Sequence, residues 1–391
     1  PENFDGEFKG PVSVEEALNQ SRNIPAVELI TKLKDRSFYQ FLIDADVGIP
    51  KNHEYYGHSL ALGGFELSLL ELVELYSMLP GGGIKKKATI LTDESKRSVS
   101  MEILSKEASF LVLDMLSRAE LQSRRFRKLP RLNTLPVSWK TGTSSGFKDA
   151  WTIGVFGPYV LGIWMGNFSG EGNRSFIGRS LAAPLFFDLM DSVRLQKELD
   201  PWMSTAWNPP KNVKEVEICP TSGKLPGPNC SHKSKIHFIP GTSPIDKCDV
   251  HRLIWVSKND GKMSCRPDPK KDVPLVHEFW PTDFIDVFNQ AGLARKLPPE
   301  GGPTCHSFLT MDQYSKGIAP EIISPKEDII YSLRTHNDSS SNIPLEANYD
   351  SSSKELYWFV DEEYIGKSQA GTSIYWQARS GKFIVKAVDD L

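Results

Sequence analysis

The stretch 139–146 constrains the fold of this chain most, because it is short, polar and basic and is flanked by apolar runs. Its sequence is WKTGTSSG, and the apolar segments 150–156 and 159–165 follow it. Gly157-Pro158 separates these two segments, and two apolar runs joined by such a dipeptide predict a β-hairpin. We therefore expect Lys140 near the end of a strand at a sheet edge, where its ammonium and the hydroxyls beside it can hold an anion.

Length and composition limit the number of domains and the classes of partner that are expected. The 391 residues predict two or three domains, and a hydrophobic share of 39% is enough to bury real cores. A formal net charge of −3 gives no nucleic-acid footprint, so no nucleic-acid partner is expected. No run approaches the roughly 18 apolar residues of a membrane span. Because the chain opens at Pro1 in the middle of a pattern, we expect a fragment of a longer protein.

The first half of the chain alternates helix and strand signals. Ser13 followed by Glu16 is a helix-capping pattern, and it predicts a helix over 14–19. Apolar periodicity predicts further helices over 38–47, 68–78, 105–116 and 182–195. With the predicted hairpin between them, residues 1–198 are expected to form an α+β domain.

The composition changes after this domain. Residues 199–320 are rich in proline and cysteine, which predicts a connector with few regular elements. Short apolar runs separated by polar turns, among them 329–331, predict a small all-β sandwich over 321–391. In its paired aromatics, Tyr357-Trp358 and Tyr375-Trp376, strand alternation should turn about half of the rings into the core.

The cysteines cluster in the connector. Of five cysteines, four fall between 219 and 265, and none precedes 219. We weigh two disulfides against a zinc site, and the lack of a C-x-x-C pair favours disulfides. The simplest pairing joins neighbours, Cys219 with Cys230 and Cys248 with Cys265, and leaves Cys305 over. No metal and no other cofactor is expected.

Two short motifs carry the chemistry, Ser21-x-Asn23 between helices and Lys140-Thr141-Gly142 on a strand. They resemble the S-x-N and K-T-G motifs of penicillin-recognising serine enzymes. The surrounding stretches strengthen the resemblance: 2–6, 17–27, 59–64, 140–144, 149–151, 219–223, 238–244 and 248–251. In order and context they resemble class A penicillin-binding proteins of the 1C type, from the C-terminal part of the transpeptidase domain to the chain's end.

The resemblance implies a fold and a function. Residues 1–198 would be an N-terminally incomplete transpeptidase domain, with an antiparallel sheet flanked by helices. Residues 199–320 would connect it to the sandwich. The implied activity is that of a peptidoglycan synthase, a D,D-transpeptidase on the periplasmic side of the bacterial inner membrane. It would act on stem peptides and bind β-lactams, and its C-terminal domain would be free to bind other cell-wall proteins.

The resemblance also assigns roles to site residues. Ser21 would relay a proton, and Asn23 would hold the substrate amide. Lys140 and Thr141 would contact the substrate carboxylate, and Gly142 would allow close backbone approach. Thr143 would give its hydroxyl to the carboxylate and its N–H to an oxyanion hole.

The family nucleophile lies in an S-x-x-K motif on a helix before S-x-N. Only 145–148 and 351–354 match that pattern by letter, and we take both as chance. The nucleophile is therefore expected upstream of Pro1, together with a glycosyltransferase domain and a membrane anchor, and this fragment alone is expected to be inactive. Two alternatives remain, a hydrolase of the β-lactamase or carboxypeptidase type and a non-catalytic scaffold or binding module of cell-wall assembly.

Overall fold

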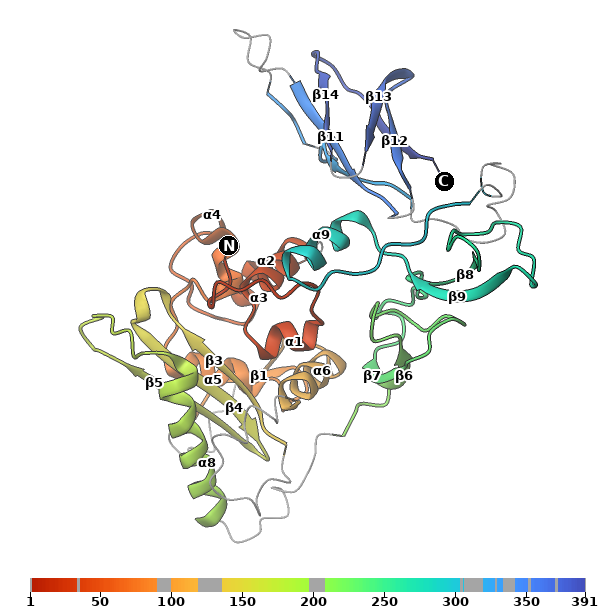
Figure 1. Ribbon diagram of the computed structural model, residues 1–391. Coiled ribbons are helices and arrows are strands. Elements are labelled where there is room, and N and C mark those ends of the chain that lie inside the picture. The colour runs from red at the N-terminus through yellow and green to blue at the C-terminus, as the bar shows by residue number, and fades with distance from the viewer. Residues whose placement is uncertain are drawn as a thin grey trace. The chain divides into compact units, whose positions relative to one another are not determined.

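The computed structural model describes most of the chain, as two compact units (Figure 1). The described residues are 2–33, 36–89, 100–118, 136–196, 208–302, 305, 319–327, 329–332, 342–350, 353–369 and 372–390. The first unit comprises Pro1–Glu7, Val12–Glu215 and His237–Ser243. The second comprises Phe8–Pro11, Val216–Ile236 and Pro244–Leu391.

The first unit is a mixed α+β domain, as predicted. Its helices are α1 (Val14–Asn19), α2 (Asn23–Thr31), α3 (Phe38–Asp44), α4 (His53–Tyr56), η1 (Gly57–Leu62), α5 (Leu69–Ser77), α6 (Lys106–Ser117), η3 (Ser145–Phe147), the π-helical turn η4 (Gly178–Ala182) and α8 (Ala183–Gln196). Its strands are β1 (Ile84–Lys86), β2 (Ser100–Glu102), β3 (Ser138–Thr143), β4 (Asp149–Phe156) and β5 (Tyr159–Gly166).

The predicted helix starts are confirmed by their caps. The Ser13 hydroxyl accepts a hydrogen bond from the Glu16 N–H at the start of α1. At α5 the hydroxyl of Ser68 and the carboxylate of Glu71 form a reciprocal capping box. Each cap satisfies backbone groups that a helix terminus leaves without an intrahelical partner. The local sequence therefore determines where these helices begin.

The central antiparallel sheet has the order β3-β4-β5 in the described part of the chain, so β3 is one of its two outer strands. Lys140 pairs with Ile153 in the β3–β4 ladder, and Gly157 turns between β4 and β5 with φ +50°. The predicted hairpin and the position of Lys140 at a sheet edge are both confirmed.

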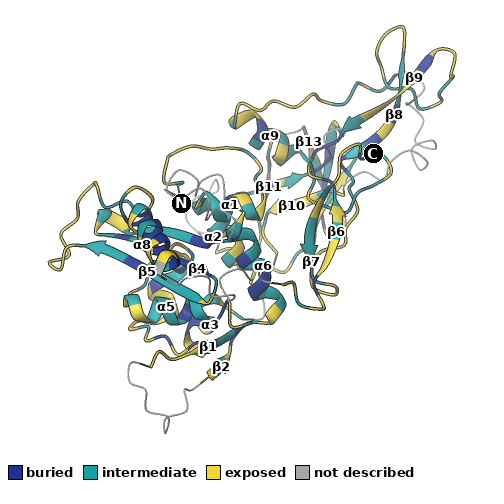
Figure 2. Ribbon diagram, turned by 90° about the horizontal axis from the view of Figure 1, so that it is seen from below, coloured by how far each residue is buried: buried dark blue, intermediate teal, exposed yellow. Residues whose placement is uncertain are grey.

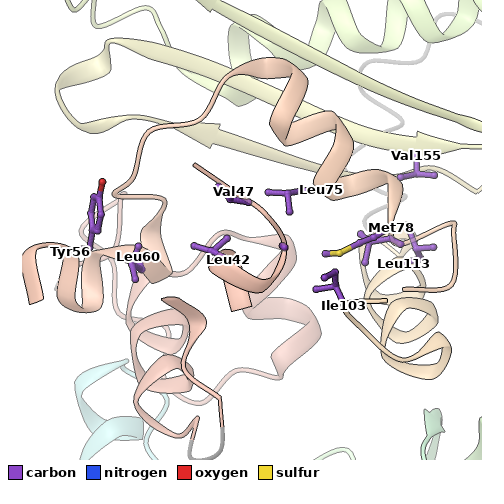
Figure 3. Close-up of a cluster of buried hydrophobic side chains, with 11 residues drawn as sticks. Leu42, Val47, Tyr56, Leu60, Leu75, Met78, Ile103, Leu113 and Val155 are labelled. Carbon is purple, nitrogen blue, oxygen red and sulfur yellow. The ribbon is translucent and has the colours of Figure 1, made fainter. Parts of the chain in front are cut away.

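Two buried clusters hold this sheet between helices. On one face Phe186, Phe187 and Met190 of α8 pack with Trp139 of β3, and all three α8 side chains are fully buried. Side chains of α5 and α6 contribute to the other cluster, drawn in Figure 3, together with Val155 of β4. Strand alternation sends Val155 and Phe156 to opposite faces, so the sheet is covered on both sides.

The second unit is built mainly of strands. Its elements are β6 (Lys214–Ile218), β7 (Ser234–Phe238), β8 (His251–Ser257), β9 (Asp272–Glu278), α9 (Thr282–Gln290), β10 (Glu321–Ser324), β11 (Asn342–Asn348), β12 (Glu355–Val360), β13 (Glu363–Gln369), β14 (Ile374–Gln377) and β15 (Val385–Asp389). The first two residues of β6 and the last two of β7 are counted with the first unit. The predicted connector thus holds more regular structure than its proline content indicated. Its strands pair as β6-β7 and β8-β9.

The C-terminal strands form the predicted sandwich. Two three-stranded sheets, β10-β11-β14 and β13-β12-β15, contribute to one buried cluster. Trp358 and Trp376 lie in that core, whereas Tyr375 is 63% exposed, so the expected alternation of aromatic rings is confirmed. The predicted strand over 329–331 is wrong, because those residues lie outside every strand.

The structure corrects the predicted disulfides. Cys265 pairs with Cys305, with their Cα atoms 5.0 Å apart, so the pairing of Cys248 with Cys265 is wrong and Cys305 is not left over. The Met263 N–H donates to the Glu300 carbonyl, and the Gly302 N–H donates to the Met263 carbonyl. These bonds bring the chain before Cys305 close to the segment that carries Cys265. Cys219, Cys230 and Cys248 carry free thiols, which also contradicts the pairing of Cys219 with Cys230.

The described helices are short. None of them combines the length and the apolar character that a bilayer span requires. Figure 2 shows how burial is distributed, with dark blue residues along α8 and β4. The site described next lies on β3 of this packed sheet.

Candidate active site

Ser21 lies in a tight turn between α1 and α2. Its φ is +57°, in the left-handed region that non-glycine residues seldom adopt, and its side chain is exposed. The Ser21 N–H donates to the Leu18 carbonyl and the Arg22 N–H to the Ala17 carbonyl, and these bonds end α1. The turn presents the hydroxyl outward, in a backbone conformation of the kind that clusters at functional sites.

The N-terminal segment holds this turn in place. The Asn3 side-chain oxygen accepts hydrogen bonds from the Asn23 N–H at 3.1 Å and the Ile24 N–H at 3.4 Å, and so caps α2. The Asn23 side-chain amide donates to the Glu2 carbonyl at 2.8 Å. Asn23 is thus engaged with the chain's own backbone on one side, and its predicted role at a substrate amide stays a prediction.

Arg22 fills the variable position of S-x-N, and sequence reasoning gave it no role. The structure buries it to 6% exposure, with its guanidinium 2.7 Å from the Asp5 carboxylate and hydrogen-bonded to the Glu7 carbonyl. A buried arginine with charged and backbone partners fixes geometry, because removing one partner leaves the other unsatisfied. Arg22 is therefore a positioning residue for the turn. In the sequence, the one signal for this role was the acidic residue Asp5 in the N-terminal segment.

Lys140 connects the two motifs. Its Nζ donates to the Ser21 hydroxyl, across 119 positions of sequence, and to the Thr141 carbonyl at 2.8 Å. Burial lowers the pKa of the Lys140 ammonium to about 8. A lysine with a pKa near neutrality can give up a proton or take one back during a reaction, which an ordinary surface lysine cannot do readily.

The other predicted residues of β3 are divided between the two faces of the strand. Strand alternation puts Lys140 and Gly142 on one face and Thr141 and Thr143 on the other. The Thr143 hydroxyl oxygen accepts a hydrogen bond from the Gly178 N–H at 3.0 Å, which ties β3 to the start of η4. That bond leaves the Thr143 hydroxyl hydrogen available, and its predicted contact with a carboxylate stays a prediction.

The S-x-x-K match over 145–148 lies directly after β3. Ser145 and Lys148 are both exposed, and Ser145 opens the single 3₁₀ turn η3 with Gly146 at φ +73°. An exposed turn of this kind does not bring the lysine amine and the serine hydroxyl together on a buried helix face. The second match begins at Ser351, which lies outside the described residues.

Four more chemically active side chains come together in the second unit. Cys219, Cys230, Cys248 and His251 place their ligand atoms within 4.8 Å of one another, and we call them the Cys3His cluster. Sequence reasoning singled out the cysteines but missed His251. The signal for it was the C-x-x-H spacing of Cys248 and His251, which is typical of metal ligands.

Comparison with known proteins points to one group. A family model described as "Penicillin-binding protein 1A, C-terminal domain" matches residues 209–253, and "Penicillin-Binding Protein C-terminus Family" matches residues 311–391. Penicillin-binding protein 1C of Escherichia coli (strain K12) is 31% identical over 411 aligned residues, which cover 100% of this chain and 50% of that protein.

Two further similarities agree. Penicillin-binding protein 1A of Clostridium botulinum (strain Hall) is 27% identical over 325 residues, covering 77% of this chain and 38% of its own length. The crystal structure of penicillin-binding protein 1A from Haemophilus influenzae superposes with a TM-score of 0.51 at 20% identity, over 63% of this chain and 43% of that one. The chain thus spans about half, or less, of the length of these relatives.

Proposed function

The chain belongs to the class A penicillin-binding proteins, and from this premise we propose that it supplies the substrate-binding wall and the proton relay of a peptidoglycan D,D-transpeptidase. One observation carries the proposal, the hydrogen bond from the K-T-G lysine, Lys140, to the S-x-N serine, Ser21. Two motifs far apart in sequence meet there through the atoms that a proton relay needs.

The proposed relay uses Ser21 and Lys140 in sequence. A nucleophilic serine gives its proton to the lysine amine of its own S-x-x-K segment and forms an ester with the stem-peptide carbonyl, and the carbon–nitrogen bond breaks. That proton later restores the charge that Lys140 gives up in the step described next. The Ser21 hydroxyl gives its proton to the leaving amine, and the Lys140 ammonium returns a proton to the Ser21 oxygen. With a pKa of about 8, Lys140 carries its proton at pH 7 and can give it up in this step.

The substrate is proposed to bind along β3. Because β3 is an outer strand of its sheet in the described part of the chain, an extended stem peptide or a β-lactam can lie against its edge. Gly142 supports close approach, since no side chain projects from that position. Lys140, Thr141 and Thr143 would surround the carboxylate, and the Thr143 N–H would contribute to the oxyanion hole.

The nucleophile is proposed to belong to an S-x-x-K segment outside these 391 residues. Support comes from the exposed turn that holds Ser145 and Lys148, which is unsuited to an activated serine. The longer protein would also carry a glycosyltransferase domain and a membrane anchor, and would work on the periplasmic side of the bacterial inner membrane.

Labelling with a fluorescent β-lactam tests the proposal. The 391-residue chain should carry no label that survives denaturation, whereas a longer chain with the S-x-x-K segment should be labelled. In the longer chain Ser21→Ala should slow acylation about 10²–10⁴-fold, as expected for a lost proton-transfer group. Ser145→Ala serves as the matched control and should leave the rate unchanged. Stoichiometric labelling of the 391-residue chain that disappears in Ser145→Ala would overturn the proposal.

A further inference from the structure

The Cys3His cluster has a geometry that hydrogen bonding does not explain. His251 Nδ1 lies 3.5 Å from Cys219 Sγ, 3.6 Å from Cys230 Sγ and 3.4 Å from Cys248 Sγ. An imidazole nitrogen has either one lone pair or one hydrogen, so it can make only one hydrogen bond at a time. Three sulfur atoms at nearly equal distances from it instead surround a common centre.

The distances fit a tetrahedral zinc ion. Zinc–sulfur bonds of about 2.3 Å and zinc–nitrogen bonds of about 2.0–2.1 Å at tetrahedral angles place sulfur and nitrogen about 3.6 Å apart. The three measured separations span 3.4–3.6 Å. All four ligand atoms also lie within 4.8 Å of one another, as one small coordination sphere requires.

The ligand types select the metal. Three thiolates and one imidazole are soft or borderline donors, which favour zinc over magnesium or calcium. Cys219 is 1% exposed and Cys230 is 8% exposed, so water has little access to either. With four protein ligands such a site is closed, and closed zinc sites are structural rather than catalytic.

The surrounding backbone is built to present these ligands. The chain turns tightly after Cys219, and the Cys219 N–H donates to the Lys224 carbonyl at 2.8 Å. Gly223 follows with φ +72°, a conformation that favours glycine, and closes the turn through its N–H to the Cys219 carbonyl.

Hydrogen bonds also join the two segments that carry the ligands. The Leu225 N–H donates to the Asp246 carbonyl, and the Cys248 N–H donates to the Leu225 carbonyl at 2.8 Å. Lys224 and Asp249 form an ion pair at 2.8 Å between the same segments. The ligands from 219–230 and those from 248–251 are therefore held together by contacts independent of any metal.

From this geometry we propose that Cys219, Cys230, Cys248 and His251 bind one structural zinc ion. The ion would fasten the loop between β6 and β7 to the start of β8. Binding releases the thiol protons and gives four coordinate bonds, with no change in oxidation state. This proposal is independent of the transpeptidase activity, since no residue of the cluster belongs to the site of Ser21 and Lys140.

The test uses the full chain, purified from cells grown with zinc and without a chelating tag. Elemental analysis should find about one zinc ion per chain. His251→Ala and Cys230→Ser should lower the zinc content about tenfold or more. His232→Ala is the matched control, because His232 lies two residues after Cys230 but outside the cluster, and it should retain the metal.

A second measurement on the unaltered chain covers variants that do not fold. Without reductant, the denatured chain should show three reactive thiols, and in the native chain these thiols should react only after a chelator removes zinc. Cobalt in place of zinc should give the absorption of a tetrahedral thiolate complex. Fewer than three thiols in the denatured chain, or a zinc content that is the same in His251→Ala and His232→Ala, would overturn the proposal.

Discussion

The β3–β5 region and the 209–302 region hold their shape in different ways. The sheet of the first unit lies between two large clusters, and Phe186, Phe187 and Met190 on one face are fully buried. In 209–302 the described hydrophobic cluster has three buried members, Val250, Trp280 and Phe288, and Val213, Ile254 and Phe279 are buried outside it. A segment with so little apolar burial needs cross-links, as small domains do. It has a disulfide and, as we propose, a zinc ion.

The difference matters for function. A proton relay requires Lys140 and Ser21 to stay within hydrogen-bond distance, and a close-packed core supports such precision because it resists displacement. The cross-linked region needs only to keep its strands together. The predictions that follow test whether each region depends on the kind of interaction assigned to it.

The largest effect is expected from a cavity under the sheet. Phe186→Ala removes a fully buried ring next to Gly154 of β4, and should lower the stability of the first unit by about 3–5 kcal/mol. Hydrogen exchange followed by mass spectrometry resolves the two units, and β3–β5 should lose protection. Leu185→Ala, on the same helix at 39% exposure, is the control and should change protection little. Equal losses in both variants would contradict the assignment of α8 to this core.

Removal of the disulfide should affect the cross-linked region next. Cys265 and Cys305 are 40 positions apart, and releasing a loop of that size should cost about 2–4 kcal/mol. The double variant Cys265→Ser/Cys305→Ser should speed hydrogen exchange in β8 and β9 and leave β3–β5 unchanged. Its zinc content should stay at the wild-type value. Loss of zinc in this variant would show that the two cross-links depend on each other.

A smaller effect is expected where the N-terminal segment caps α2. Asn3→Ala removes the acceptor for the N–H groups of Asn23 and Ile24, and should destabilise α2 by about 0.5–2 kcal/mol. Faster hydrogen exchange at the start of α2 would report the loss. Glu2→Ala is the matched control, because only the backbone carbonyl of Glu2 contacts Asn23. If both variants exchange alike, Asn3 has no capping role.

Sequence predicted the local parts of this structure well. Helix starts at Ser13 and Ser68 follow from caps within four residues, and the β4–β5 hairpin follows from a two-residue turn. The meeting of Ser21 with Lys140 was expected only through the family resemblance, because a contact across 119 positions depends on the whole fold.

The cross-links show where local reasoning fails. Cysteines that are neighbours in sequence were the simplest predicted disulfide partners. The observed pairing instead depends on how the loops bring distant segments together. The return of 300–302 to Met263 gave Cys265 its partner, and the bonds through Leu225 brought Cys219 and Cys248 together. Buried Arg22 was missed for a similar reason, since its partners Asp5 and Glu7 lie in a segment without regular structure. Such contacts form only when distant segments meet in the folded chain, and hydrophobic periodicity in the sequence does not predict them.

The titration of Lys140 tests whether packing around β3 keeps water away from its ammonium group. Burial lowers its pKa from 10.5 to about 8, so the folded chain binds fewer protons than the unfolded chain between these values. Stability should therefore rise as the pH increases from about 8 to 10.5, and Lys140→Met should lack this rise. For the same reason, carboxylate binding by the ammonium should weaken as the pH rises through about 8.

Ser21→Ala tests whether burial alone accounts for the low pKa of Lys140. With lysines carrying ¹³C-methyl labels, the NMR signal of Lys140 should titrate with a midpoint near 8. Ser21→Ala removes the hydroxyl that accepts the hydrogen bond but leaves the surrounding protein in place, so the midpoint should stay near 8 if burial is the cause. A midpoint close to the ordinary value of 10.5 in both proteins would show that water reaches the ammonium. Close packing of the β3–β5 region would then not exclude water from Lys140. The proposed difference between this region and the cross-linked region would be contradicted for the lysine on which the proposed relay depends.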